Sequence, residues 1–258
     1  MFVKQYIQQT DSTNNFLKQL ATQTTLEQGY TVYTSLQTAG RGQQGNTWDS
    51  EPDKNLLFST LFYPEQLKAL QQFRLSMAVA VQVNKVLRKY VPQTVIKWPN
   101  DIYINHQKMG GMLIENQLSG EFIKQSVIGI GININQLTFR KDIPNPTSLA
   151  LQTKQHHNIS SILDEILISF EELNHMTENF SELKQQYFEH LYRKEGFFLY
   201  RERKADSAPV NIDTHNDNTC FNAKIIDIEE NGQMILEREN HSRKAYYFKE
   251  LQFIISQK

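Results

Sequence analysis

The alternation of apolar and polar residues predicts a chain built mainly from strands, with helices between them. Runs rich in Tyr, Thr, Val, Leu and Ile are typical of strands. The first three such runs are "GYTVYTSLQ" (29–37), "NLLFSTLFY" (55–63) and "TVIKW" (94–98). Three more, "DIYIN", "MGGMLIENQL" and "EFIKQSVIGIGININ", follow between residues 101 and 135 and predict an antiparallel series.

Apolar residues at three- and four-residue steps predict three helical stretches. The first follows Asp11, Ser12, Thr13 and Asn14, which are all good helix caps. The second runs from about Leu70 to Val91. The third, from Ser160 to Arg193, is the longest, and we expect one break inside it and an end at Gly196.

After Gly196 the pattern changes to short strands. "AKIIDIEENGQMILERE" (223–239) reads as two alternating runs around Asn231-Gly232, which suits a tight primed turn. "KAYYFKELQFII" (244–255) adds more strand. We therefore predict an α/β (α+β) fold: a domain over residues 1–195 with a mixed sheet and packed helices, then a small β-barrel-like unit over residues 196–258.

Composition narrows the class of protein. The chain has 258 residues, 39% of them hydrophobic and 21% charged, which is typical of a globular protein. The formal net charge of -1 gives no bulk cationic field for nucleic acid or an anionic membrane. Cys220 is the single cysteine, so an intramolecular disulfide and a cysteine-cluster metal site are excluded. With no signal-like or membrane-spanning apolar run, we expect a reduced, cytoplasmic protein.

Two neighbouring strands carry unusual glycines. In "GIGININ" the isoleucines share one strand face, and Gly129, Gly131, Asn133 and Asn135 share the other. In "GGMLIE", Gly111 alternates with Gly110 in the same way. Glycine weakens a strand unless something must approach its backbone closely. Close packing of a helix explains either segment alone, but the two together favour a floor for a flat ligand.

Polar and charged residues cluster in "KWPNDIY" (97–103). Pro99 favours an extended Trp98, and Asn100 and Asp101 suit a tight turn. As an ordinary hairpin corner this segment would need no ligand. As a site, Lys97 could meet phosphate or carboxylate, Asp101 could orient an incoming amine, and Lys108 would project into the same region.

The loop "AGRGQQGNTW" (39–48) places three glycines around Arg41. Backbone N–H groups freed by glycine make an anion cradle, and Arg41 adds a fixed charge. The loop lacks the Gly-Lys-Ser/Thr ending of a Walker loop. It matches G-x-G-x-x-G in form, but no helical pattern follows it, so a dinucleotide fingerprint is not favoured.

In this order, "DSTN" (11–14), "QTAGRGQQGNTW" (37–48), "KWPNDIY", "KMGGMLIE" (108–115) and "GIGININ" (129–135) resemble the catalytic core of biotin–protein ligases. The resemblance extends over nearly the whole chain. It implies a class II aminoacyl-tRNA synthetase-like catalytic domain and an SH3-like C-terminal barrel. It also implies a two-step reaction in which ATP, with Mg²⁺, activates biotin as biotinyl-5′-AMP, and a lysine of a biotin carboxyl carrier protein then takes the biotinyl group.

The resemblance assigns roles to residues by their place in these motifs. The biotin-binding set is Ser12, Thr13, Asn14, Gln37, Gly40, Arg41, Lys108, Gly111 and Met112. The ATP- or adenylate-binding set is Gly42, Gln43, Gly45, Trp48 and Asn133. The catalytic set is Arg41, Lys97, Asp101 and Lys108, and no metal ligand is assigned. The glycine loop would be mobile when empty and ordered over the adenylate.

The sequence departs from the family pattern in two places. The family loop usually reads GRGRxGR, but here Gln43, Gln44 and Asn46 leave Arg41 as its only cation. We expect weaker electrostatic retention of the adenylate as a result. Only ten residues precede "DSTN", so we expect a monofunctional ligase without the winged helix-turn-helix domain, and no DNA binding by that route.

Three other interpretations stay open at this stage. A lipoate–protein ligase shares the fold, although "KWPND" and "GRGQQG" favour biotin. A degenerate, non-catalytic biotin- or nucleotide-binding protein would not need Arg41, Lys97, Asp101 and Lys108. A β-rich interaction module would explain the C-terminal hairpins but not the clustered glycines and cations. The family includes homodimers, and we allow for one here.

Overall fold

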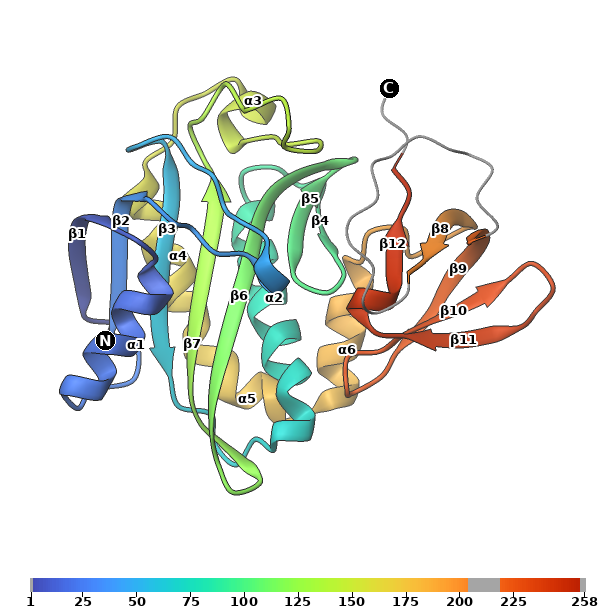
Figure 1. Cartoon of the computed structure of the whole chain (residues 1–258), viewed down its shortest axis with the longest axis horizontal. Helices are drawn as coiled ribbons and strands as arrows, with labels where there is room; N and C mark the ends of the chain where they lie inside the picture. Colours follow the sequence, from blue (N-terminus) through green and yellow to red (C-terminus); the bar gives the residue numbers. More distant parts are fainter. Residues whose placement is uncertain (1, 204–218, 256–258) are drawn as a thin grey trace.

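The computed structural model describes residues 2–203 and 219–255. These residues form two β-sheets with helices packed around the larger one (Figure 1). The predicted α/β class, with a mixed sheet and a separate C-terminal β unit, is confirmed. The predicted boundary between residues 195 and 196 lies in the connector between the last helix and the first strand of the smaller sheet.

The larger sheet has seven strands in the order β1-β2-β3-β7-β6-β5-β4. Strands β1 and β2 are parallel and all other neighbours are antiparallel. The strands are β1 (Lys4–Thr10), β2 (Thr31–Gln37), β3 (Asn55–Phe62), β4 (Thr94–Lys97), β5 (Asp101–Ile104), β6 (Gln107–Ser119) and β7 (Phe122–Asn133). Strand β1 was not predicted, because its three glutamines hide the apolar alternation; it forms by pairing at the sheet edge.

Helices cover both faces of this sheet, but unequally. Helix α1 (Thr13–Gln23) packs on the face that carries the glycines of β7, where Leu17 is buried with Val127. The opposite face carries the β7 isoleucines and packs against α2 (Gln72–Arg88), whose Lys85 and Arg88 suit the negative end of its dipole. Among the described residues, no helix is long and apolar enough to cross a membrane.

The third predicted helical stretch consists of α4 (Ile159–Ser169), the 3₁₀ turn η3 (Phe170–Glu172), α5 (Leu173–Glu178) and α6 (Phe180–Glu189). Its one non-helical residue is Asn179, so the expected single break is present, but the stretch ends at Glu189 and not at Gly196. Asn179 leaves the helical conformation and its side chain accepts a hydrogen bond from the Glu182 N–H, so it caps α6. The short helix α3 (Leu149–Thr153) and the 3₁₀ turns η1 (Gln43–Gly45), η2 (Ala69–Gln71) and η4 (Phe248–Glu250) complete the set.

The smaller sheet has five antiparallel strands in the order β11-β10-β9-β8-β12. They are β8 (Phe198–Glu202), β9 (Cys220–Ile228), β10 (Met234–Arg238), β11 (Arg243–Tyr246) and β12 (Leu251–Phe253). In the described part of the chain β11 and β12 do not pair, so the sheet is not closed there by hydrogen bonds. Part of the predicted unit, residues 204–218 and 256–258, lies outside the described residues.

The β9–β10 turn differs from the predicted primed turn. A type I′ turn needs a positive φ at both central residues, but only Gly232 has one, at 89°. The loop instead closes between Glu229 and Gln233, whose N–H and carbonyl are 2.8 Å apart. A longer loop lets Gly232 approach the larger domain: the Gly232 carbonyl accepts a hydrogen bond from Trp98 Nε1 at 3.1 Å. This contact fixes the smaller sheet beside the end of β4.

Candidate active site

A cavity lies on the α1 face of the larger sheet, between α1, the glycine loop, strands β6 and β7, and the C-terminal unit. Elements far apart in the sequence meet there, as the packing in Figure 1 indicates. Twelve of the predicted site residues line it: Ser12, Thr13, Asn14, Gln37, Arg41, Gly42, Gln43, Trp48, Asp101, Lys108, Gly111 and Met112.

One end of the cavity is polar and uncharged. The Thr13 backbone N–H and hydroxyl both donate to Gln37 Oε1, at 2.8 and 3.1 Å. Asn14 Nδ2 donates to the Leu113 carbonyl at 3.2 Å. Ser59 Oγ, buried beneath them, lies 2.7 Å from Thr13 Oγ1 and 2.6 Å from Asn14 Oδ1. These bonds fix the orientation of hydroxyl and amide groups that can recognise a neutral polar ligand.

Glycines clear the floor of the cavity. A Cβ on Gly129 would lie 2.0 Å from Asn14 Oδ1, and one on Gly131 would lie 2.6 Å from Trp48 Cε2. A Cβ on Gly111 would lie 3.2 Å from Asp101 Oδ1. Each glycine therefore makes room for one predicted site residue: Asn14, Trp48 and Asp101 respectively. The predicted floor is present, and the protein's own side chains lie directly on it.

The middle of the cavity holds a charged pair. Lys108 Nζ lies 2.6 Å from Asp101 Oδ1. The same ammonium is 5.9 Å from the centre of the Trp48 ring, within cation–π range. Asp101 and Lys108 come together because β5 and β6 form a tight antiparallel hairpin, in which Asp101 pairs with Gly111. A cation, a carboxylate and an aromatic ring are thus grouped where an anionic ligand could bind.

Lys97 does not line this cavity. Lys97 is the cross-strand partner of Asp101 in the β4–β5 pair, and its ammonium is 3.9 Å from Asp101 Oδ2, 5.2 Å from the centre of the Tyr103 ring and 4.8 Å from the centre of the Phe253 ring. Burial lowers the pKa of the Lys97 amine, although Asp101 opposes this effect. Its side chain is only 12% exposed. Lys97 is therefore placed to act on Asp101 rather than on a ligand.

Three other predicted residues are also outside the cavity lining: Gly40, Gly45 and Asn133. Asn133 Nδ2 instead donates to the Thr147 carbonyl at 3.0 Å and ties down the connector before α3. Gly40 lies at the base of the loop, where a Cβ would be 2.3 Å from the Trp48 carbonyl. Met112 lines the cavity, but its side chain belongs to the buried core behind the sheet. Met112 therefore contributes its backbone to the cavity lining.

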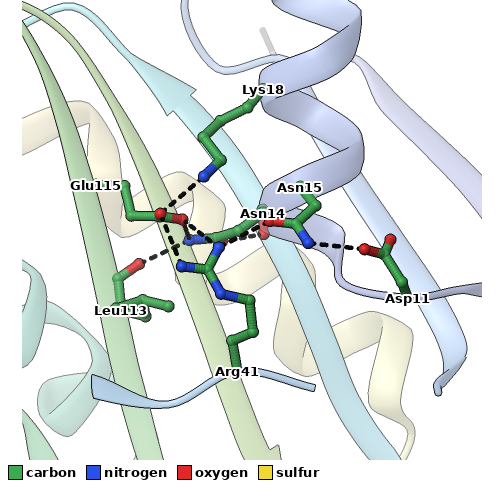
Figure 2. A network of polar contacts seen from close by, with 8 residues as sticks. Asp11, Asn14, Asn15, Lys18, Arg41, Leu113 and Glu115 are labelled. Atoms are coloured by element: carbon green, nitrogen blue, oxygen red, sulfur yellow. Dashed lines mark hydrogen bonds and ion pairs between the residues drawn. The ribbon is translucent and has the colours of Figure 1, made fainter. Parts of the chain in front are cut away.

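The glycine loop folds as a small hairpin. Arg41 and Thr47 form an isolated bridge, and the Gly42 N–H donates to the Asn46 carbonyl at 2.7 Å. The Arg41 guanidinium leaves the loop and reaches α1 and β6, where it contacts Asn15 and Glu115 (Figure 2). The loop thus lies across one side of the cavity in this structure.

Several cavity residues were not assigned from the sequence. Phe248 comes from η4 of the C-terminal unit and packs edge-on against Trp98, with ring centres 5.8 Å apart. Asn100 and Leu113 line the cavity from the two sides of the β5–β6 hairpin. The alternation of Leu113 and Glu115 with Gly111 could have indicated their common face. Nothing local to Phe248 could have indicated its role, since it depends on how the two units pack.

The described residues contain no group of three or more His, Cys, Asp or Glu side chains that could hold a metal ion. The two carboxylates nearest the cavity, Asp101 and Glu115, are both engaged by cations. Mg²⁺ commonly binds through substrate phosphates with few protein ligands, so we expect it to arrive with the nucleotide.

Comparison with known proteins agrees with this geometry. The sequence pattern of the Biotin/lipoate A/B protein ligase family matches residues 6–133. The bifunctional ligase/repressor BirA of Bacillus spizizenii is 31% identical over 227 residues, covering 85% of this chain and 65% of that protein. The biotin–[acetyl-CoA-carboxylase] ligase of Paracoccus denitrificans is 34% identical over 128 residues, covering 48% of this chain and 52% of that protein.

Solved structures extend the likeness over the whole fold. The biotin protein ligase of Aquifex aeolicus, solved in complex with biotin and ATP, superposes with a TM-score of 0.75 at 24% identity. The alignment covers 99% of this chain and 100% of the Aquifex chain, including the C-terminal unit. This chain spans 65% of the length of the Bacillus relative. The family pattern identifies residues 6–133 of the chain as a biotin/lipoate A/B protein ligase family domain.

Proposed function

We propose that this chain activates biotin with ATP as biotinyl-5′-AMP and transfers the biotinyl group to a lysine of a biotin carboxyl carrier protein. One observation carries the proposal. One glycine-cleared floor carries a neutral polar end, where Asn14 lies over Gly129, and further along it Trp48 over Gly131 lies beside the Asp101–Lys108 pair over Gly111. This order matches a neutral ring system, a carboxylate that must meet phosphate, and a nucleotide base. The names of the relatives support the same substrates.

Ser12, Thr13, Asn14 and Gln37 would bind the biotin ring system. The neutral ureido group of biotin both donates and accepts hydrogen bonds, so it needs a fixed set of hydroxyl and amide partners. Thr13 holds Gln37 by its oxygen, which leaves the Gln37 amide N–H groups for a ligand. Gly111 and the backbone of Met112 would contact the aliphatic chain.

In the first step, a carboxylate oxygen of biotin attacks the α-phosphorus of ATP. A new P–O bond forms, the bond to pyrophosphate breaks, and biotinyl-5′-AMP is the product. Two anions must meet, so a positioned cation lowers the barrier. Lys108 would supply this cation. Gly42, Gln43 and the loop around Gly40 and Gly45 would cover the phosphate, and Trp48, with Asn133 near it in the fold, would face the adenine end.

In the second step, the carrier lysine amine attacks the carbonyl carbon of the mixed anhydride. A C–N bond forms, the C–O bond breaks, AMP leaves with its electron pair, and the amine loses a proton. Asp101 would accept a hydrogen bond from the incoming amine and orient it. Lys97, buried beside Asp101, would hold that carboxylate in place.

The test is exchange of labelled pyrophosphate into ATP by the purified chain with Mg²⁺ and no carrier. We expect exchange with biotin and none with lipoate. Exchange with lipoate alone would assign the chain to lipoate activation, and no exchange with either acid would favour a binding protein. Transfer is then tested with a biotin carboxyl carrier domain, its acceptor-lysine-to-arginine variant being the control. Placement in the cytoplasm and a homodimer stay predictions.

A further inference from the structure

Glu115 is a carboxylate shared by three elements. It follows Gly111 and Leu113 on the cavity side of β6. Its Oε1 accepts hydrogen bonds from Lys18 Nζ at 2.7 Å and from Arg41 Nη2 at 3.1 Å. Its Oε2 accepts from Asn14 Nδ2 at 2.8 Å and from Arg41 Nη1 at 3.3 Å. Figure 2 shows the glycine loop, α1 and β6 converging on this one group.

Arg41 is held on the α1 side as well. Its Nη1 donates to Asn15 Oδ1 at 2.7 Å, and Asn15 Nδ2 donates in turn to Asp11 Oδ2 at 2.7 Å. Arg41 is the only Lys or Arg between Lys18 and Lys54. The one cation of the glycine loop therefore contacts both Glu115 and Asn15.

The Glu115 carboxyl is ionised, as its contacts with Lys18 and Arg41 require. Partial burial alone would raise the pKa of the Glu115 carboxyl, but hydrogen bonds from Lys18 and Asn14 and the charge of Arg41 outweigh it, so the pKa is lowered. Glu115 is thus ionised at neutral pH. Lys18 remains paired with it whether or not Arg41 is bound, so release of the loop does not leave the carboxylate without a counter-charge.

We propose that Glu115 is a positioning residue that fastens the glycine loop to α1 and β6 through Arg41 and at the same time orients Asn14 in the polar end of the cavity. The role of Asn14 in binding biotin rests on the proposed function. The attachment of the loop through Arg41 and Glu115 does not. Because both contacts use one carboxylate, the closed loop and the correctly oriented Asn14 favour each other.

Trypsin gives a direct readout of the loop. It cuts after Lys and Arg, and Arg41 is the only such residue in the loop, so a cut there yields fragments 1–41 and 42–258, identified by mass. The Arg41 side chain must leave Glu115 to enter the protease. We expect Glu115→Gln to be cut at Arg41 about fivefold faster than the wild type without ligands, the upper range for a single exposed ion pair.

Two further variants separate fastening from a general structural role. Lys18→Met removes the other cation but leaves Arg41 its bonds to Glu115 and Asn15, so its cutting rate at Arg41 should stay within about twofold of wild type. Glu115→Gln can still accept from Asn14 through its amide oxygen, so the biotin KM in pyrophosphate exchange should rise less than in Glu115→Ala. Glu115→Ala loses both contacts and should raise that KM about tenfold as well as exposing Arg41.

Equal cutting of wild type and Glu115→Gln at Arg41 would overturn the proposal. So would equal acceleration by Lys18→Met, or faster cutting of Glu115→Gln at Arg140 and Lys141 in the exposed connector to the same degree as at Arg41. The proteolysis uses ligand-free protein. Absence of pyrophosphate exchange in the wild type would therefore reject the proposed function while leaving the loop result to be judged by itself.

Discussion

The Lys108 ammonium lies 2.6 Å from Asp101 Oδ1, directly over the space left by Gly111. The pair brings together a cation suited to a carboxylate–phosphate encounter and a carboxylate suited to an incoming amine. Lys97 also contacts Asp101 but lies outside the cavity lining. It is therefore not positioned to replace Lys108 or Asp101 in contact with a ligand. The two half-reactions should therefore depend on different members of the pair.

We predict that Lys108→Met lowers biotin-dependent pyrophosphate exchange by about 10²–10³-fold, because a single positioned donor to developing charge is worth that much. Asp101→Asn should lower exchange by less than about tenfold but lower transfer to a carrier domain by about 10²-fold or more. Exchange and single-turnover transfer from preformed adenylate measure the two steps. Lys68→Met, an exposed lysine far from the cavity, is the control. Equal losses in both steps for Asp101→Asn would contradict its assignment.

Substitution of the two floor glycines, Gly129 and Gly131, should change the KM values for biotin and ATP differently. Gly129→Ala forces its Cβ onto Asn14, so we expect the KM for biotin to rise about tenfold or more with a smaller change for ATP. Gly131→Ala forces its Cβ onto Trp48, so the larger rise should be in the KM for ATP. Pyrophosphate exchange at varied biotin and varied ATP gives both values. A reversed pattern would mean that the ligand lies in the opposite direction along the floor.

Substitution of the two tryptophans should affect stability to very different degrees. Trp98 is buried and its Nε1 donates to Gly232, so Trp98→Phe leaves a carbonyl without its partner and should lower the free energy of unfolding by about 2–3 kcal/mol. Trp48 Nε1 is buried without a hydrogen bond among the described residues. Trp48→Phe should therefore change stability by less than about 0.5 kcal/mol. Urea denaturation followed by circular dichroism tests this, and similar losses for both would argue against it.

Stability should also depend on pH through Glu237. Hydrogen bonds from Lys224 and Arg243 lower the pKa of this carboxyl from its ordinary value of 4.5 to about 2. Between these values the unfolded chain binds more protons than the folded one, so the stabilisation present above pH 4.5 is lost as pH falls towards 2. Glu237→Gln should flatten this part of the profile of urea midpoint against pH. An unchanged slope would show that the pairing does not persist in solution.

Local pattern was sufficient for much of the fold and for the floor of the site. The period-two alternation in "GIGININ" separates isoleucines that are buried against α2 from glycines that face α1, and both faces are where the sequence predicts them. The predicted loop, the helix start at Ser12 and the Asp101–Lys108 pair also follow from local spacing. These features succeed because strand and turn geometry is decided within a few residues.

What the sequence could not indicate depends on packing between distant elements. Lys97 and Asp101 are four residues apart, yet only the position of Phe253 from the C-terminal unit encloses Lys97. Glu115 ends the motif "KMGGMLIE", but its role depends on Lys18, Asn14 and Arg41, which approach it from two other segments. The β9–β10 turn was mispredicted because Gly232 also has to contact Trp98, a tertiary demand that local turn chemistry does not include.

The placement of Phe248 has a consequence for synthesis in the cell. The floor of the cavity is complete once Asn133 has been made, but the aromatic ring that covers it comes from residue 248. At 5–20 residues per second, a ribosome takes roughly 6–20 s to add the intervening residues. During that interval a nascent chain holds an open floor without its cover. Such a chain would release a reactive adenylate to water, so full activity should begin only after the C-terminal unit has emerged from the ribosome and docked.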